Sequence, residues 1–193
     1  MNKILATLSL ACLSLTASAQ ELKSPNGELK MEFSVDAQGR PTYYLQYKGQ
    51  DIIKPSHLGL ELKQEDPNKA QDFEFKTRAD ASKLAQKANL TSGFVITGHE
   101  NTTFDETWQP VWGEESSIRN HYNELCVTLS QPVNDRFIKI RFRLFDDGLG
   151  FRYEYQVPQV DSVFVMDELT SFNLAQDGKS WSIPASFETY ELL

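Results

Sequence analysis

The most distinctive side chains of the sequence lie in TWQPVWGEESSIRNHYNEL, residues 107–125. The stretch contains two of the chain's three tryptophans and one of its three histidines. Its spacing fits neither a helix nor a strand, so we expect a loop. Aromatic rings stack on the apolar faces of sugars, and carboxylate, amide and guanidinium groups bind sugar hydroxyls. The mixture favours carbohydrate recognition, and its candidate site residues are Trp108, Trp112, Glu114, Arg119, Asn120 and His121.

Two other interpretations of the paired tryptophans stay open at the level of sequence. In the first, Trp108 and Trp112 cap the open end of a hydrophobic core, where large rings bury much area. In the second, the loop packs against another domain. The sequence alone does not separate these two interpretations.

Common catalytic templates are absent from the sequence. It contains no G-x-S-x-G, P-loop, G-x-G-x-x-G, H-E-x-x-H or C-x-x-C pattern. His57, His99 and His121 are too far apart for a metal-ligand spacing, and the first two are expected in turns. Cys126 lies in an apolar stretch, so we expect a buried structural thiol. A chain with no obvious nucleophile is more often a binding or packing module than an enzyme.

The N-terminus is typical of a secretory signal peptide. Lys3 precedes an apolar run over residues 4–15, and a small-residue cleavage sequence, A-S-A, ends at Ala19. The run is shorter than the about 20 residues that a membrane-spanning helix needs. We therefore predict a signal peptide over residues 1–19 and a secreted, periplasmic protein. A lipoprotein signal at Cys12 is the weaker alternative.

The chain that follows this leader is acidic. Removing the leader takes away one lysine and no acid, which changes the net charge from −8 to about −9. Such a surface repels phosphate backbones and anionic headgroups, so we expect neither nucleic acid nor a membrane as partner. One cysteine remains, so the core must hold the fold without a disulfide within the chain.

Apolar and polar residues alternate along most of the chain, which is the pattern of half-buried strands. The alternating segments are 31–35, 43–47, 125–129, 138–144, 151–155, 163–165 and 181–183. Residues 138–155 are expected to form a long hairpin around a glycine-bearing turn. Only residues 79–88 suit a short helix, and residues 63–71 suit a polar surface loop. Short strands without intervening helices predict one all-β domain, an antiparallel β-sandwich.

Three blocks of sequence carry a resemblance to a known family. They are W-Q-P-V-W-G-E, R-N-H-Y-N-E and D-G-L-G-F-R-Y, which begin at Trp108, Arg119 and Asp147. With these blocks in this order, the chain resembles the N-terminal domain of glycoside hydrolase family 97. The resemblance implies a large, mutarotase-like super-sandwich over residues 20–193 that packs on a catalytic (β/α)8 barrel. In that family the barrel cleaves α-glucosidic or α-galactosidic bonds.

No catalytic residue is assigned to this chain. A (β/α)8 barrel takes about 250 residues, and the sequence ends at Leu193 without one. We therefore expect a fragment, a truncated product or a free-standing descendant of the domain, inactive alone. The catalytic carboxylates of the family lie on the barrel, so none is carried over.

The resemblance also implies one metal ligand. In the calcium-dependent α-glucosidase branch, a Pro-x-x-aromatic segment precedes a glutamate that reaches the barrel and helps to bind Ca²⁺. Pro184 and Phe187 set the register in this chain. The resemblance thus assigns Glu191 as a calcium ligand, with Glu188 as runner-up. One carboxylate supplies few of the six to eight oxygens that Ca²⁺ takes, so calcium is expected only with the barrel present.

Two hypotheses of different classes follow. In the first, the chain is the non-catalytic sandwich of a secreted α-glucosidase or α-galactosidase, and the six site residues face the barrel and the rim of the sugar site. In the second, it is a stand-alone periplasmic carbohydrate-binding protein. An α-linked oligosaccharide of glucose or galactose is the expected ligand in either case.

Overall fold

The alternating segments form antiparallel strands in the computed structural model, which describes residues 19–62, 89–133, 136–156 and 165–179. The strands are β1 (Gln20–Lys23), β2 (Leu29–Val35), β3 (Pro41–Tyr47), β4 (Gln50–His57), β5 (Leu60–Leu62), β6 (Val95–Trp108), β7 (Ile118–Gln131), β8 (Arg136–Leu144), β9 (Leu149–Gln156), β10 (Val165–Glu168) and β11 (Asn173–Leu174). The described residues contain no helix, and thus none that is long and apolar enough to cross a membrane. The helix predicted over 79–88 and the strand predicted over 181–183 lie outside the described residues.

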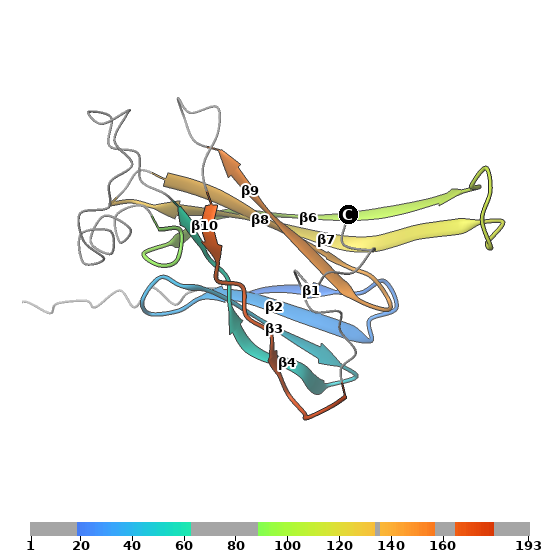
Figure 1. The fold of residues 1–193 in the computed structure, drawn as a ribbon, viewed down its shortest axis with the longest axis horizontal. Coiled ribbons are helices and arrows are strands. Elements are labelled where there is room, and N and C mark those ends of the chain that lie inside the picture. Colours follow the sequence, from blue (N-terminus) through green and yellow to red (C-terminus); the bar gives the residue numbers. More distant parts are fainter. Residues whose placement is uncertain (1–18, 63–88, 134–135, 157–164, 180–193) are drawn as a thin grey trace, which may run out of the picture.

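The strands build two facing sheets and one short pair (Figure 1). The first sheet has the order β1-β2-β3-β4-β11, the second has the order β6-β7-β8-β9, and β10 pairs with β5. Every pairing in these sheets is antiparallel. The predicted hairpin over 138–155 is confirmed as β8 and β9, with Leu144 opposite Leu149 at its closed end. The prediction of an all-β antiparallel sandwich is confirmed.

The hydrophobic core lies between the two sheets. Along each strand the inward residues alternate with outward polar ones, as the period of 2 predicts. The core residues that β2, β7 and β8 contribute are Leu29, Met31, Phe33 and Val35, then Leu125, Val127 and Leu129, then Ile138, Ile140, Phe142 and Leu144. The rings of Phe33 and Phe142 meet across the sheets with centroids 5.6 Å apart. Each side chain of this size stabilises the fold by about 1.5–3 kcal/mol through burial.

A close backbone contact joins the β2–β3 turn of the first sheet to the chain entering β6 of the second. Gly93 N donates to Gln38 O at 3.0 Å, and Phe94 N donates to Gly39 O at 2.9 Å. Gly39 has φ of 74°, and a Cβ there would lie 2.6 Å from backbone atoms of Gly93 and Phe94. Only glycine fits this position, because both the left-handed φ and the lack of space exclude a side chain.

Two expectations about histidines are wrong. His57 ends β4 and His99 lies within β6, so neither is a turn residue. The Nδ1 atom of His57 lies 3.1 Å from the hydroxyl of Thr42, its partner in the strand ladder. His57 lies two residues after Pro55, and His99 directly follows Gly98. Proline and glycine usually interrupt strands, which explains why the pattern was misleading.

Candidate functional site

The predicted site is a projecting arm of the second sheet. The arm consists of Phe104–Trp108 of β6, Ile118–Tyr122 of β7 and the tip residues 109–117. Strand β7 pairs with β8 only from Asn123 onward, so the arm is a two-stranded ribbon. Figure 1 shows it extending beyond the sandwich. The expectation of one loop over 107–125 is therefore wrong for Arg119, Asn120 and His121, which lie in strand β7.

Strand alternation separates the predicted residues onto two faces of the arm. Arg119 and His121 share the face that carries Leu125 of the core, which we call the inner face. Trp108 and Asn120 lie on the opposite, outer face, because Trp108 pairs with Ile118. Trp112 and Glu114 lie in the tip. The structure thus distributes the six residues along one arm and does not bring them to one point.

The inner face of the arm is polar. Arg119 donates to both carboxylate oxygens of Asp105. Its Nε atom lies 2.8 Å from Oδ1, and its Nη2 atom lies 2.7 Å from Oδ2. This hydrogen bonding from Arg119 lowers the pKa of Asp105. His121 lies opposite Asp105 in the ladder. At the base of the arm, Asn123 Nδ2 donates to Lys23 O at 2.8 Å and ties β7 to β1. The bidentate pair orients Arg119 along the ribbon.

The outer face and the tip of the arm carry aromatic rings, of which Tyr122 is buried and the others are exposed. Phe104 and Tyr122 stack with centroids 5.2 Å apart, and the Arg143 guanidinium lies 4.6 Å from the centroid of Tyr122. Beyond this stack, Trp108 is 46% exposed and Trp112 is 89% exposed. The interpretation that the two tryptophans cap the core is wrong, because neither belongs to the buried cluster. Two interpretations of Trp108 and Trp112 remain, stacking on a sugar and packing against another domain.

Charged residues that sequence reasoning did not single out lie next to this aromatic face. Glu124 of β7 is buried and accepts from Arg143 Nε at 2.7 Å and from Arg141. Arg141 Nε also donates to Glu154 at 2.6 Å. Burial by itself would raise the pKa of Glu124, but the two arginines outweigh it and lower the pKa. Hydrogen bonding from Arg141 lowers the pKa of Glu154 to about 2.

This charge network holds its carboxylates ionised and therefore gives the site no general acid. The signal for it was present in the sequence, since Arg141 and Arg143 alternate with the buried residues of β8. Cys126, on the same face, is buried, and desolvation raises the pKa of its thiol more than Arg141 lowers it. The expected structural thiol is confirmed as a buried, free cysteine.

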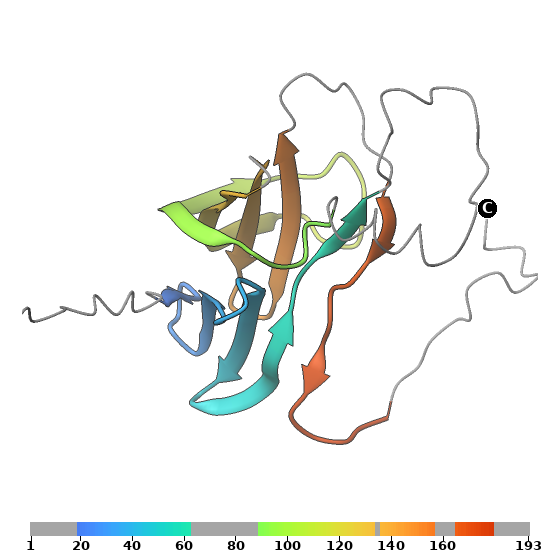
Figure 2. The same ribbon diagram turned by 90° about the vertical axis from the view of Figure 1, so that its left-hand side faces the viewer.

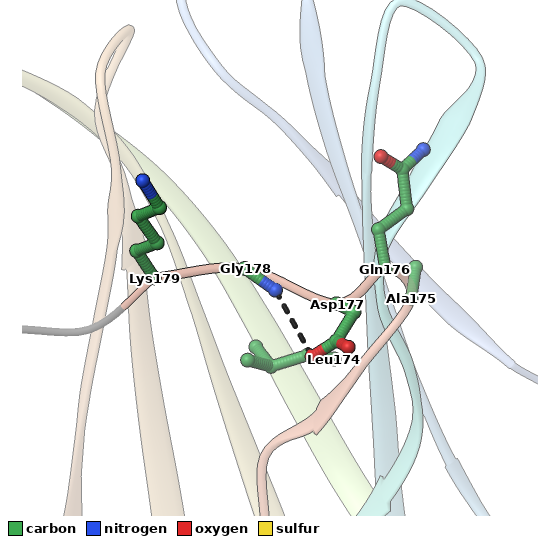
Figure 3. A pocket seen from close by; sticks show the side chains of 6 residues that line it. All are labelled: Leu174, Ala175, Gln176, Asp177, Gly178 and Lys179. Carbon is green, nitrogen blue, oxygen red and sulfur yellow. Dashed lines mark hydrogen bonds between the residues drawn. The ribbon is translucent and has the colours of Figure 1, made fainter.

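The predicted calcium ligand Glu191 and its runner-up Glu188 lie outside the described residues. Within the described part of the chain, no three His, Cys, Asp or Glu side chains cluster as a metal would need. A shallow hollow is lined by Leu174–Lys179 (Figure 3), where Gly178 N donates to Asp177 Oδ1 at 3.2 Å. Gln176 and Lys179 lie at opposite ends of it, so its polar groups do not converge on a ligand.

The chain belongs to a family of N-terminal domains of glycosidases. The glycosyl-hydrolase 97 N-terminal family matches residues 22–193, and the chain is a member of it. It is 26% identical over 187 residues to a retaining alpha-galactosidase of Bacteroides thetaiotaomicron, across 92% of this chain and 24% of that protein. The family resemblance expected from the sequence is confirmed.

Solved structures of the family are similar to the described fold. A glycoside hydrolase family 97 enzyme from Pseudoalteromonas sp. strain K8, with structures in complex with panose and with acarbose, matches with a TM-score of 0.65 and 28% identity. The match covers 81% of this chain and 20% of that one. A beta-arabinopyranosidase, 21% identical with a TM-score of 0.63, supports the fold alone. The chain thus spans a quarter or less of the length of these relatives.

Proposed function

We propose that this domain is the non-catalytic N-terminal sandwich of a secreted α-glycosidase and that its arm contacts the catalytic part at the rim of the sugar site. The observation that carries the proposal is the exposure of Trp112 and Trp108 on a ribbon that extends beyond the sandwich. An isolated two-stranded ribbon is marginally stable in water. A surface that covers its aromatic face would stabilise it.

The relatives support a sugar as the ligand of the enzyme to which such a domain belongs. One is an alpha-galactosidase, and structures of another contain panose or acarbose. In the proposal, Trp112 and Glu114 of the tip lie nearest the sugar, while Trp108 and Asn120 contact the catalytic part. Arg119 and His121 form the polar side of the arm. We further propose that Glu191 supplies one calcium ligand when a catalytic part is present, and that the leader directs the protein to the periplasm.

The test measures hydrolysis and sugar binding by the chain from Gln20 onward. We expect no hydrolysis of maltose, aryl α-glucosides or aryl α-galactosides, because glycoside hydrolysis needs a positioned pair of carboxylates, and the family resemblance assigns that pair to the barrel. Turnover that survives removal of contaminating enzyme would refute this proposal. Millimolar or tighter binding of panose, lost in Trp112→Ala and retained in the matched control Val111→Ala, would instead favour a stand-alone carbohydrate-binding protein.

A further inference from the structure

The charge network, which the proposed function does not use, lies on the outer face of the second sheet, away from the core. Figure 2 shows this sheet, coloured green to orange, as a layer separate from the blue and cyan strands of the first sheet. Glu124 accepts from Arg143 Nε at 2.7 Å and from Arg141. Glu154 accepts from Arg141 Nε at 2.6 Å and from Arg152 Nη2 at 2.7 Å. The network therefore crosses β7, β8 and β9 and ends in an arginine on each side.

The two end arginines have hydrogen-bond donors left over. Arg141 in the middle uses Nε, Nη1 and Nη2 on the two carboxylates. Arg143 binds through Nε alone, and Arg152 binds through Nε and Nη2. Among the described residues, both Nη groups of Arg143 and the Nη1 group of Arg152 have no hydrogen-bond partner. The side chains of Arg143 and Arg152 are 40% and 62% exposed, so a ligand can reach these donors.

The end arginines are held in position by the sheet. Glu124 is buried and binds the Nε side of Arg143, whose guanidinium lies 4.6 Å from the centroid of the Tyr122 ring. Arg143 lies opposite Gly150 in the ladder, two residues from Arg152. The Cα atoms of such diagonal neighbours are about 7–8 Å apart. A positioned guanidinium with paired N–H groups left over is suited to bind the oxygens of an anion side by side.

This side of the sheet is positive in an acidic chain. The outward positions of β7, β8 and β9 carry four cations against two carboxylates, namely Lys139, Arg141, Arg143 and Arg152 against Glu124 and Glu154. The surplus is two positive charges, whereas the whole sequence has a net charge of −8. Glu100 also lies on this face, but on β6, at the opposite edge of the sheet from β9. Charge complementarity favours an anionic partner beside β8 and β9.

An aromatic ring adjoins the Arg143 end of the network. Phe104 is exposed and stacks on Tyr122 with centroids 5.2 Å apart. It lies at the base of the arm, where the ribbon joins the four-stranded sheet. A ring beside a guanidinium can stack on the apolar face of a sugar while the guanidinium binds a charged group of that sugar.

We propose that Arg143, Arg152 and Phe104 form a binding surface for an acidic oligosaccharide, whose carboxylate or sulfate groups the two arginines bind. The inference does not depend on the proposed function. Two surplus charges are few for a nucleic acid, because tight binding of that kind neutralises several phosphates. They match a short sugar chain with one acidic group for each end arginine.

Isothermal titration calorimetry of the purified chain tests the proposal. The probes are tetragalacturonate, which carries carboxylates, sulfated maltotetraose and, as the neutral control, maltotetraose. At about 20 mM salt, we expect an acidic probe to bind at least about tenfold more tightly than maltotetraose. Binding should weaken by about tenfold at about 200 mM salt, because salt screens exposed charges. Trp112→Ala should leave the binding of the acidic probe unchanged, since the tip of the arm is not involved.

Substitutions locate the surface. Arg143→Gln should weaken the binding of the acidic probe by about tenfold, because it removes charge-assisted hydrogen bonds. Arg143→Lys keeps the charge but not the paired donors, so it should recover little of the affinity. Phe104→Leu should weaken binding by about threefold through loss of the ring. The matched control Arg40→Gln removes another arginine that is 45% exposed and ion-paired at 2.7 Å to Asp36, and it should leave binding unchanged.

Arg152→Gln provides an independent test, because its partner Glu154 keeps Arg141 and the buried part of the network stays intact. Far-UV circular dichroism checks the folding of each variant. Failure of both acidic probes to bind at low salt overturns the proposal, as does binding that Arg143→Gln and Arg152→Gln leave unchanged. Equal affinity for maltotetraose overturns the role of charge. Tighter binding of a single-stranded DNA oligomer than of either acidic sugar would make a nucleic acid the occupant and overturns the inference.

Discussion

Replacing Gly39 with alanine should strongly destabilise the sandwich. The turn that contains Gly39 contacts the chain that enters β6, and a Cβ at this position would lie 2.6 Å from Gly93 Cα, Gly93 N and Phe94 N. These are backbone atoms, so no side-chain rotation can relieve the overlap. The turn and the entering chain must separate for the methyl group to fit.

The cost has two parts. Alanine in the left-handed conformation that Gly39 adopts, with φ of 74°, costs about 1 kcal/mol. Separating the two segments weakens the hydrogen bonds from Gly93 N to Gln38 O and from Phe94 N to Gly39 O, each contributing about 1 kcal/mol. The free energy of unfolding should therefore fall by about 3 kcal/mol.

Gly49 provides the matched control. Its φ is 80°, and a Cβ there meets no atom within 4 Å, so Gly49→Ala should cost only the backbone part, about 1 kcal/mol. Urea unfolding of the chain from Gln20 onward, followed by far-UV circular dichroism, measures both variants. Their midpoints should differ by about 1 M urea for a slope of about 2 kcal/mol/M. Equal losses in Gly39→Ala and Gly49→Ala would refute the close-contact argument.

Two further predictions concern the arm and the charge network. The double variant Trp108→Ser/Trp112→Ser should lose less than about 1 kcal/mol of stability, because both rings are exposed. It should also scatter less light than the parent chain at equal concentration. A loss above about 3 kcal/mol would show that the two rings are buried in the core. Because the pKa of Glu154 is lowered to about 2 from 4.5, its ion pair with Arg141 stabilises the fold above pH 4.5 and is lost as pH falls toward 2. Solvent screening limits this contribution to about 1 kcal/mol. Urea midpoints between pH 2 and 7 should fall less steeply for Glu154→Gln than for the parent chain, and parallel curves would contradict the assignment.

The sequence by itself determined the strands that have one buried face. Met31, Phe33 and Val35 alternate with polar residues, as do Ile138 and Ile140, because one side of each strand faces the core. The family also followed from the sequence, since its blocks combine tryptophans, glycines and charged residues in a fixed order. The burial of Cys126 could be predicted for the same reason as the strands.

The arm could not be recognised as strands from its sequence. Periodicity appears only where one face is buried, and the outer half of β6 is exposed on both faces. Arg119, Asn120 and His121 therefore seemed irregular although they continue strand β7. Once Arg119 and Asn120 are known to be strand residues, they must lie on opposite faces, because successive side chains of a strand alternate.

Only the tertiary structure decided that several apolar residues of the segment Val165–Ala175 are exposed. Leu169 and Phe172 look like ordinary core residues in the sequence, yet Leu169 is 40% exposed, and Phe172 is 57% exposed although its ring lies against Tyr43 and Phe151. The same holds for Gly39, whose need for glycine comes from a segment 54 residues away in the chain, at Gly93. The alternation of apolar and polar residues in the sequence indicates which face of a strand is buried. This alternation does not indicate which distant segment packs against the strand, because the contact depends on how all the strands pair.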